Sequence, residues 1–204
     1  MVDNTITVLD ISNEGLTELT ELPDDIDKYT NLEKLYCQYN QITSLNNLPS
    51  NLKELYCDSN KITILDNLPP LLEVLNCINN EITSLDNLPP TLKELNCTNN
   101  QLTSLDNLPQ NLEILHCYDN QITSLDNLPQ KLDILYCYNN QLTSLDNLPP
   151  KLEVLYCHQN QITSLDNLPS TLEELYCGDN PLKYDFKPTF ENIRNYNASR
   201  MLYS

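Results

Sequence analysis

Apolar residues recur along most of the chain with a spacing that repeats every twenty residues. From Leu32 to Asn180 the unit L-x-x-L-x-C-x-x-N-x-I/L-T-x-L-D-N-L-P-x-x occurs eight times, with few exceptions, such as Asn46 in place of Asp and Ile64 in place of Ser. A fixed period of this length is typical of a solenoid, in which each repeat forms one coil and stacks on its neighbours.

Each unit contains one short segment with the pattern of a strand. In Leu115-His116-Cys117 the side chains alternate with period two, so Leu and Cys share one face and His lies on the other. The prolines near the end of each unit, such as Pro129, favour an extended return and leave no room for a long return helix. We therefore expect a parallel sheet with strands about 4.8 Å apart.

The segments that flank the repeats differ from them. Five apolar residues near the N-terminus occupy core-like positions without the cysteine: Ile6, Leu9, Ile11, Leu16 and Leu19. The stretch PDDIDKYTNL then delays the first full repeat, and we expect it to contain a helical turn. Near the C-terminus Phe190, Ile193 and Tyr196 have the spacing of the apolar stripe of a short helix.

Because a stack of coils needs covered ends, the sequence predicts three parts. Residues 1–31 form an atypical repeat that serves as an N-terminal cap, residues 32–180 form the eight repeats, and residues 181–204 form a C-terminal cap. The alternative for the last part is a separate binding tail, since it holds Lys183, Lys187, Arg194 and Arg200.

The stretch L-x-x-L-x-C-x-x-N-x-I resembles the core of leucine-rich repeats, with Cys in the third apolar position. The twenty-residue length and the L-P-x-x-L link are similar to the short repeats of bacterial effector proteins and of giant-virus (mimivirus-like) repeat proteins. This resemblance implies an α/β-type leucine-rich repeat solenoid, made mostly of β and coil, whose right-handed coils carry a parallel sheet on the concave face. Effector ligases of this group carry a catalytic domain after the repeats, and the chain has no room for one.

Two columns of repeated residues are expected to be structural. The cysteines should point together into the core as small apolar groups, because their parallel Cβ vectors disfavour disulfides and no C-x-x-C pair starts a zinc site. The asparagines should satisfy backbone groups of the turns. The columns are Cys37, Cys57, Cys77, Cys97, Cys117, Cys137, Cys157 and Cys177, and Asn40, Asn60, Asn80, Asn100, Asn120, Asn140, Asn160 and Asn180.

A third column consists of carboxylates and has two interpretations. Its members are Asp66, Asp86, Asp106, Asp126, Asp146 and Asp166. We expect each Asp-Asn pair to shape a turn through side-chain-to-backbone hydrogen bonds, with solvent screening the charge. The alternative is a bound cation, since carboxylates about 5 Å apart repel one another. We expect neither a resident metal nor a cofactor.

The variable positions that point away from the core carry the functional information. Three consecutive repeats place aliphatic and aromatic groups side by side there, with acidic residues at the rim (Glu113, Asp119, Asp133 and Glu153). Such exposed apolar, tyrosine-rich patches are typical of interaction sites, although stacked rows also stabilise a sheet without a partner. The predicted partner-binding residues are Tyr36, Tyr56, Ile114, His116, Tyr118, Ile134, Tyr136, Tyr138, Val154, Tyr156, His158 and Tyr176.

The sequence LEILHCYDN around His116 invites comparison with a catalytic cluster. Adjacent residues of one strand face opposite sides, so Cys117 and His116 cannot form the hydrogen-bonded pair that nucleophilic catalysis needs. The chain has only two glycines and no glycine-rich phosphate loop. We therefore predict that the protein is not an enzyme.

The formal net charge of −18 limits the partners further. So negative a surface repels phosphate backbones and anionic lipids, which argues against nucleic acid and membranes, and it attracts a basic partner; the alternative is that the charge serves solubility alone. The N-terminus lacks the pattern of a signal peptide, so the eight cysteines favour an intracellular, reducing compartment, which would be a host cytoplasm for a viral or effector-like protein.

Together these features predict a protein–protein interaction module that binds a partner with basic and apolar features on its concave face. The alternative is a structural repeat protein that associates with itself through that face or through the ends of its sheet.

Overall fold

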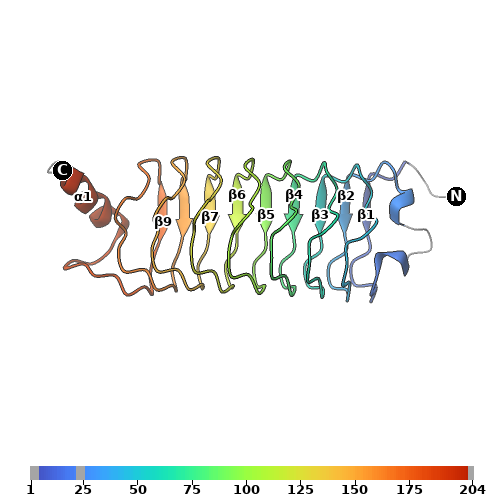
Figure 1. Cartoon of the computed structure of the whole chain (residues 1–204), viewed down its shortest axis with the longest axis horizontal. Coiled ribbons are helices and arrows are strands. Elements are labelled where there is room, and N and C mark those ends of the chain that lie inside the picture. The colour runs from blue at the N-terminus through green and yellow to red at the C-terminus, as the bar shows by residue number, and fades with distance from the viewer. Residues whose placement is uncertain (1–4, 22–25, 202–204) are drawn as a thin grey trace.

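The computed structural model describes residues 5–21 and 26–201, and it forms one row of stacked coils (Figure 1). In these residues nine parallel strands lie side by side in sequence order. They are β1 (Val8–Asp10), β2 (Lys34–Tyr36), β3 (Glu54–Tyr56), β4 (Val74–Asn76), β5 (Glu94–Asn96), β6 (Ile114–His116), β7 (Ile134–Tyr136), β8 (Val154–Tyr156) and β9 (Glu174–Tyr176). The predicted solenoid with a parallel sheet is confirmed.

Helices are confined to the two ends of the row. Two 3₁₀ turns, η1 (Leu19–Glu21) and η2 (Ile26–Lys28), lie near the N-terminus, and helix α1 (Phe190–Met201) lies near the C-terminus. Residues 32–180 contain no helix, as the prolines predicted. The turn expected in PDDIDKYTNL corresponds to η2, whereas residues 23–25 of that stretch lie outside the described residues. No helix of the described chain is both long and apolar enough to span a membrane.

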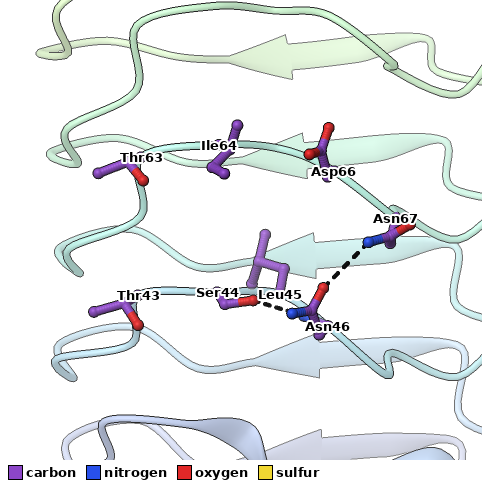
Figure 2. A pocket seen from close by; sticks show the side chains of 8 residues that line it. All are labelled: Thr43, Ser44, Leu45, Asn46, Thr63, Ile64, Asp66 and Asn67. Carbon is purple, nitrogen blue, oxygen red and sulfur yellow. Dashed lines mark hydrogen bonds between the residues drawn. The ribbon is translucent and has the colours of Figure 1, made fainter.

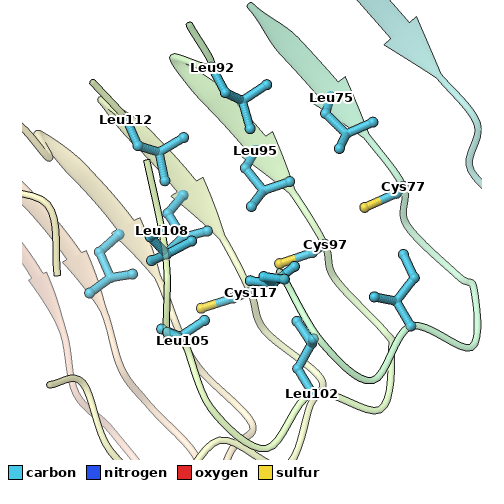
Figure 3. Packing of buried hydrophobic residues seen from close by; sticks show 14 of the residues in the cluster. Leu75, Cys77, Leu92, Leu95, Cys97, Leu102, Leu105, Leu108, Leu112 and Cys117 are labelled. Carbon is cyan, nitrogen blue, oxygen red and sulfur yellow. The ribbon is translucent and has the colours of Figure 1, made fainter. Parts of the chain in front are cut away.

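The interior of each coil is filled by the repeated apolar residues. Figure 3 shows Leu95, Cys97 and Leu102 pointing into the same space as their counterparts in the neighbouring coils. These three side chains are at most 1% exposed, and the same positions are buried in nearly every repeat. Burial of each leucine contributes about 1.5–3 kcal/mol, and each coil shares this interior with its neighbours. Stacking therefore supplies the core that one repeat lacks.

Two backbone positions per repeat adopt left-handed dihedral angles. They turn the chain into and out of the segment that connects one strand to the next. One follows the aspartate column, as at Asn67 (φ 59°), and the other precedes the asparagine column, as at Asn79 (φ 54°). Asn occupies most of these positions, because its short polar side chain tolerates this region better than other L-residues do. The left-handed Asn of each Asp-Asn pair thus sets the shape of the coil.

The two ends of the stack are packed differently from its middle. Ile193 of α1 is fully buried, and Phe190 and Tyr196 are half-buried beside it. The Asn197 Nδ2 atom donates a 2.8 Å hydrogen bond to the carbonyl oxygen of Leu165, which joins α1 to the last coils. At the other end Ile11 and Leu19 are buried, while Ile6, Leu9 and Leu16 are half-buried against the core. The division into caps and repeats remains our prediction.

Candidate functional site

The asparagine column connects each coil to the one before it. The Asn60 Nδ2 atom donates 3.0 Å hydrogen bonds to the carbonyl oxygens of Cys57 and of Cys37, one coil earlier. Its Oδ1 atom accepts a 2.9 Å bond from the Ile42 amide. The same arrangement recurs from Asn40 to Asn180, for example at Asn140. These side chains are therefore committed to the backbone and are not available to a ligand.

The cysteine column is buried, and all eight thiols are free. Burial raises the pKa of the Cys37, Cys97 and Cys137 thiols to about 12, so they stay protonated at neutral pH. A protonated thiol is a poor nucleophile and a poor metal ligand. Cys117 is fully buried, whereas the neighbouring His116 stacks on Tyr136 on the outer face of the sheet. The two side chains therefore cannot act as a catalytic pair.

The outer face carries two aromatic stacks that cross consecutive coils, one on strands β6–β8 and one two residues further along each chain segment. In the first stack the ring centroids of His116 and Tyr136, and those of Tyr136 and Tyr156, are 4.4 Å apart. In the second stack Tyr118 lies 4.2 Å from Tyr138 and Tyr138 lies 4.3 Å from His158. Stacked aromatic pairs contribute about 0.5–1.5 kcal/mol each beyond the area that they bury. Burial also lowers the pKa of His116, which favours its neutral form.

An aliphatic row lies beside the first stack and completes a continuous surface. Ile114, Ile134 and Val154 are half-buried and occupy matching positions on paired strands. We call these three residues and the two stacks the aromatic patch. It comprises Ile114, His116, Tyr118, Ile134, Tyr136, Tyr138, Val154, Tyr156 and His158.

The other three predicted site residues lie on the same face but outside the aromatic patch. Tyr36 and Tyr56 stack on each other at 4.8 Å near the N-terminal end, separated from the patch by the asparagines of β4 and β5. Tyr176 lies on β9, where its ring is tilted by 51° against Tyr156 and is 59% exposed. The face therefore has an aromatic pair at one end and a larger aromatic surface at the other.

A column of acidic side chains precedes strands β6–β9. It consists of Glu113, Asp133, Glu153 and Glu173, and we call it the acidic column. The equivalent positions of the first four repeats alternate in sign, and ion pairs join Lys53 to Glu33 at 2.9 Å and Lys93 to Glu73 at 2.6 Å. Lys93 also lies close enough to Glu113 for that carboxylate to raise its pKa. The ion pairs found within residues 26–199 do not include the acidic column.

Sequence reasoning missed one cluster at the N-terminal end of this face. The Lys34 Nζ atom lies 5.7 Å from the ring centroids of both Tyr36 and Tyr56 and forms a 2.6 Å ion pair with Glu54. The Tyr56 hydroxyl donates a 3.0 Å hydrogen bond to the same carboxylate. The signal was present in the sequence, since Lys34 and Glu54 hold the same position in consecutive repeats.

The aspartate column lies on the return side of the coils. The Asp86 carboxylate accepts hydrogen bonds from the Ser84 hydroxyl at 2.6 Å and from the Asn107 Nδ2 atom at 2.8 Å. Both bonds lower the pKa of Asp86. The described residues contain no group of three or more metal-ligating side chains close enough to hold an ion. Asp66 and Asp126 accept similar bonds, from the Asn87 Nδ2 atom and the Ser124 hydroxyl. These bonds join side chains, and the bond to the backbone that was expected from Asp is made by serine, since the Asp86 amide donates to the Ser84 hydroxyl at 3.1 Å.

The return side also has a shallow recess between two coils, shown in Figure 2. It is lined by Thr43, Ser44, Leu45, Asn46, Thr63, Ile64, Asp66 and Asn67. The matching residues of two later coils line a similar recess around Asp146 and Asp166. Because the recess recurs with the repeat, it is a feature of the coil geometry and does not mark a special site.

Comparison with known proteins identifies the repeats. A family model described as leucine-rich repeats (2 copies) matches residues 30–70 and 110–150. The comparison with curated proteins gave no match. The chain carries leucine-rich repeats, and its fold is a leucine-rich repeat solenoid.

Solved structures of bacterial proteins share this fold. YopM from Yersinia enterocolitica is 35% identical, with a TM-score of 0.80 over 92% of this chain and 41% of YopM. The functional domain of InlJ from Listeria monocytogenes, which includes a cysteine ladder, is 41% identical, with a TM-score of 0.76 over 89% of this chain and 41% of that domain. A Shigella effector leucine-rich repeat domain is 29% identical, with a TM-score of 0.56 over 98% of this chain and 78% of that domain. The chain thus spans about two fifths of the first two structures.

Proposed function

We propose that this leucine-rich repeat solenoid is a protein-interaction module that binds a partner on the aromatic patch. Solenoids of this kind commonly use their extended sheet face for binding. The observation that carries the proposal is the pair of aromatic stacks that cross three consecutive coils and, with the aliphatic row, form one continuous apolar surface. Tyrosine-rich surfaces are typical of binding hot spots.

The rest of the sheet argues that the patch serves more than the stability of the fold. Strands β4 and β5 pair in the same register as β6–β8, yet they carry Asn76 and Asn96 where β7 and β8 carry tyrosines. Two residues after these asparagines the chain has Ile78 and Thr98, where β6–β8 are followed by Tyr118, Tyr138 and His158. The sheet therefore forms without aromatic stacks, and their concentration in one half supports a binding role.

The charges beside the patch define the chemistry of the partner. The acidic column lies next to the aliphatic row, and the whole chain has a formal net charge of −18. Opposite charge at the rim of an interface speeds association and selects the partner, while an apolar centre supplies affinity. We therefore propose a protein with basic and apolar features, and we propose neither nucleic acid nor a membrane as partner.

The test compares two tyrosine pairs on the same face. A protein retained from a host-cell lysate by the immobilised wild type is identified, and its affinity is then measured against each variant. Tyr136→Ala with Tyr156→Ala should weaken binding roughly thirty-fold or more, because two hot-spot rings are removed. Tyr36→Ala with Tyr56→Ala, the matched pair outside the patch, should bind like the wild type. Equal affinity of the two double variants would reject the patch as the binding site.

Self-association is a second candidate, supported by the end of the sheet. Strand β1 lies at one end of the nine-stranded order, and Val8 is 54% exposed there. Unpaired strand edges recruit further strands. Pairing through the outer face is less favourable, since it would bring two acidic columns together. Sedimentation over a wide range of concentration separates the candidates, because a monomer at every concentration excludes self-association.

We further propose that the chain has no catalytic activity of its own and acts in a reducing compartment. The eight free, buried thiols and the absence of an accessible nucleophile–base pair at His116 support this. Similarity to bacterial effector repeats supports action inside a host cell. The resemblance to giant-virus repeat proteins stays a proposal that rests on the repeat sequence alone.

A further inference from the structure

Two sites at opposite ends of the outer face are built from the same three residues in the same register. Near the N-terminal end Lys34 pairs with Glu54 and Tyr36 with Tyr56 across strands β2 and β3. Near the C-terminal end Val154 pairs with Glu174 and Tyr156 with Tyr176 across β8 and β9. The same Tyr–Glu–Tyr set of residues therefore occurs twice in the same register, with Lys34 beside it in the first copy and Val154 in the second.

The N-terminal copy holds a cation that belongs to the chain itself. The Lys34 ammonium lies 5.7 Å from both ring centroids and 2.6 Å from the Glu54 carboxylate. An ammonium over aromatic faces is attracted by the ring quadrupoles, and the carboxylate adds a charged hydrogen bond. The hydrogen bond to Glu54 is also the main cause of the raised pKa of Lys34. This copy shows how the arrangement accommodates an ammonium group.

The C-terminal copy has the same acceptors without the cation. The Glu174 carboxylate accepts a hydrogen bond from the Tyr156 hydroxyl of the preceding strand, whereas Glu54 accepts its bond from Tyr56 of its own strand. The Tyr156 and Tyr176 rings are tilted by 51°, whereas the Tyr36 and Tyr56 rings beside the lysine are 19° from parallel. Tyr176 is 59% exposed, so the site is open to a partner.

We propose that Tyr156, Glu174 and Tyr176 form a subsite for a lysine side chain of the protein partner. The partner's ammonium occupies the place that Lys34 takes at the other end, and its aliphatic stem lies along Val154 at the border of the aromatic patch. This inference rests on the proposed function, and it specifies that the β8–β9 end of the aromatic patch selects a lysine ammonium group. Because the acidic column lies on the same half of the face, a basic segment is attracted to the subsite before it docks.

The experiment uses the full chain and a lysine blocked by acetyl and methylamide groups, with the identically blocked norleucine as the uncharged probe. Ring signals of the four tyrosines are followed by nuclear magnetic resonance at low salt. In the wild type the lysine probe should shift Tyr156 and Tyr176 in a saturable manner and leave Tyr36 and Tyr56 unchanged. The norleucine probe should shift none of them.

Four variants make the result decisive. Val154→Lys should fill the subsite from within and abolish the shifts, while Lys34→Val should open the N-terminal copy and add shifts of Tyr36 and Tyr56. Glu174→Gln should weaken the probe roughly ten-fold or more, because it removes the charge of the carboxylate. Glu94→Gln, which changes a glutamate in the same row on β5, should leave the shifts as in the wild type. All four positions tolerate such residues, since this row already contains Lys, Glu, Val and Ile.

Two outcomes would overturn the subsite. One is an undiminished response of Tyr156 and Tyr176 in Val154→Lys, and the other is an equal response of all four tyrosines in the wild type. Either result leaves the proposed function standing if the partner still depends on Tyr136 and Tyr156. Conversely, a partner that ignores the Tyr136→Ala with Tyr156→Ala variant rejects the binding patch whatever the probe does.

Discussion

Strands β2–β5 and strands β6–β9 enclose the same interior but carry different outer faces. In both halves the leucines and the cysteines keep the same buried positions, and the asparagine column keeps the same hydrogen bonds. On the outside, the first half has alternating charges joined in ion pairs, together with asparagines. The second half has stacked rings and the acidic column.

This difference separates the residues that make the fold from those that give the surface its chemistry. A substitution inside a coil disturbs hydrogen bonds and packing that continue into the coils on both sides. A substitution on the outer face affects only its neighbours in the row, and the sheet keeps its register. The variable rows can therefore change their binding chemistry without a change of architecture.

The largest loss of stability is expected when an interior leucine is truncated, and it should be the same in both halves. Leu55→Ala and Leu135→Ala each remove a fully buried side chain from a central strand. Each should lower the free energy of unfolding by about 2–5 kcal/mol, through lost burial and a residual cavity. Urea denaturation of both variants measures this. A loss in one half only would show that the two interiors are not equivalent.

A smaller change in stability is expected from substitutions in the row that contains Asp58 and Tyr138. Its sign should differ between the two halves. Tyr138→Ala removes two stacking contacts and should cost about 1–3 kcal/mol. At the same position of the second repeat, burial raises the pKa of Asp58, so its charged form is unfavourable in the folded chain. Asp58→Asn should therefore raise the urea midpoint slightly at neutral pH. A lowered midpoint for Asp58→Asn would mean that the carboxylate makes a favourable contact.

The smallest expected effect is a pH dependence of stability that arises from His116 in the second half. Burial lowers the pKa of His116 below its usual 6.5, so the unfolded chain binds the proton more readily than the folded one. The corresponding stability is present above pH 6.5 and is lost as the pH falls from that value through the lower pKa of the folded chain. The ring stacks on Tyr136 and contacts the Asn96 amide.

The matched control for this pH effect is His116→Asn, which copies the residue of the preceding strand. The urea midpoint of the wild type should fall more than that of His116→Asn between about pH 7.5 and about pH 5.5, where most carboxylates remain ionised. Identical pH profiles for the two proteins would contradict the lowered pKa.

The period and the alternation of side chains were enough to predict the solenoid, the parallel strands and the lack of return helices. This success has a physical cause: the same interior position recurs in every coil, so one misplaced residue would leave an unfilled or overfilled core. The opposite orientations of His116 and Cys117 followed from the two-residue period of a strand. For the candidate site, the alternation also predicted which residues point outward.

Other features depend on distances between side chains and did not follow from the pattern. The face-to-face stacking of Tyr118 with Tyr138 depends on side-chain rotamers, which alternation does not specify. The position of Lys34 beside the stacked Tyr36 and Tyr56 rings depends on the reach of a flexible side chain towards Glu54. The left-handed backbone at Asn67 and Asn79 could be inferred only in part, from the preference of Asn for turns.

The bonds from each asparagine to its own coil and to the preceding one also bear on how such a chain can change in length. Asn100 holds the carbonyl oxygens of Cys97 and Cys77, and Asn120 holds those of Cys117 and Cys97. If one whole unit were deleted or duplicated, each asparagine would meet equivalent carbonyl oxygens in its own coil and in the coil before it. These hydrogen bonds would therefore be kept. Unequal recombination between neighbouring units could then lengthen or shorten the protein in steps of one rung, and selection would act on the exposed rows alone.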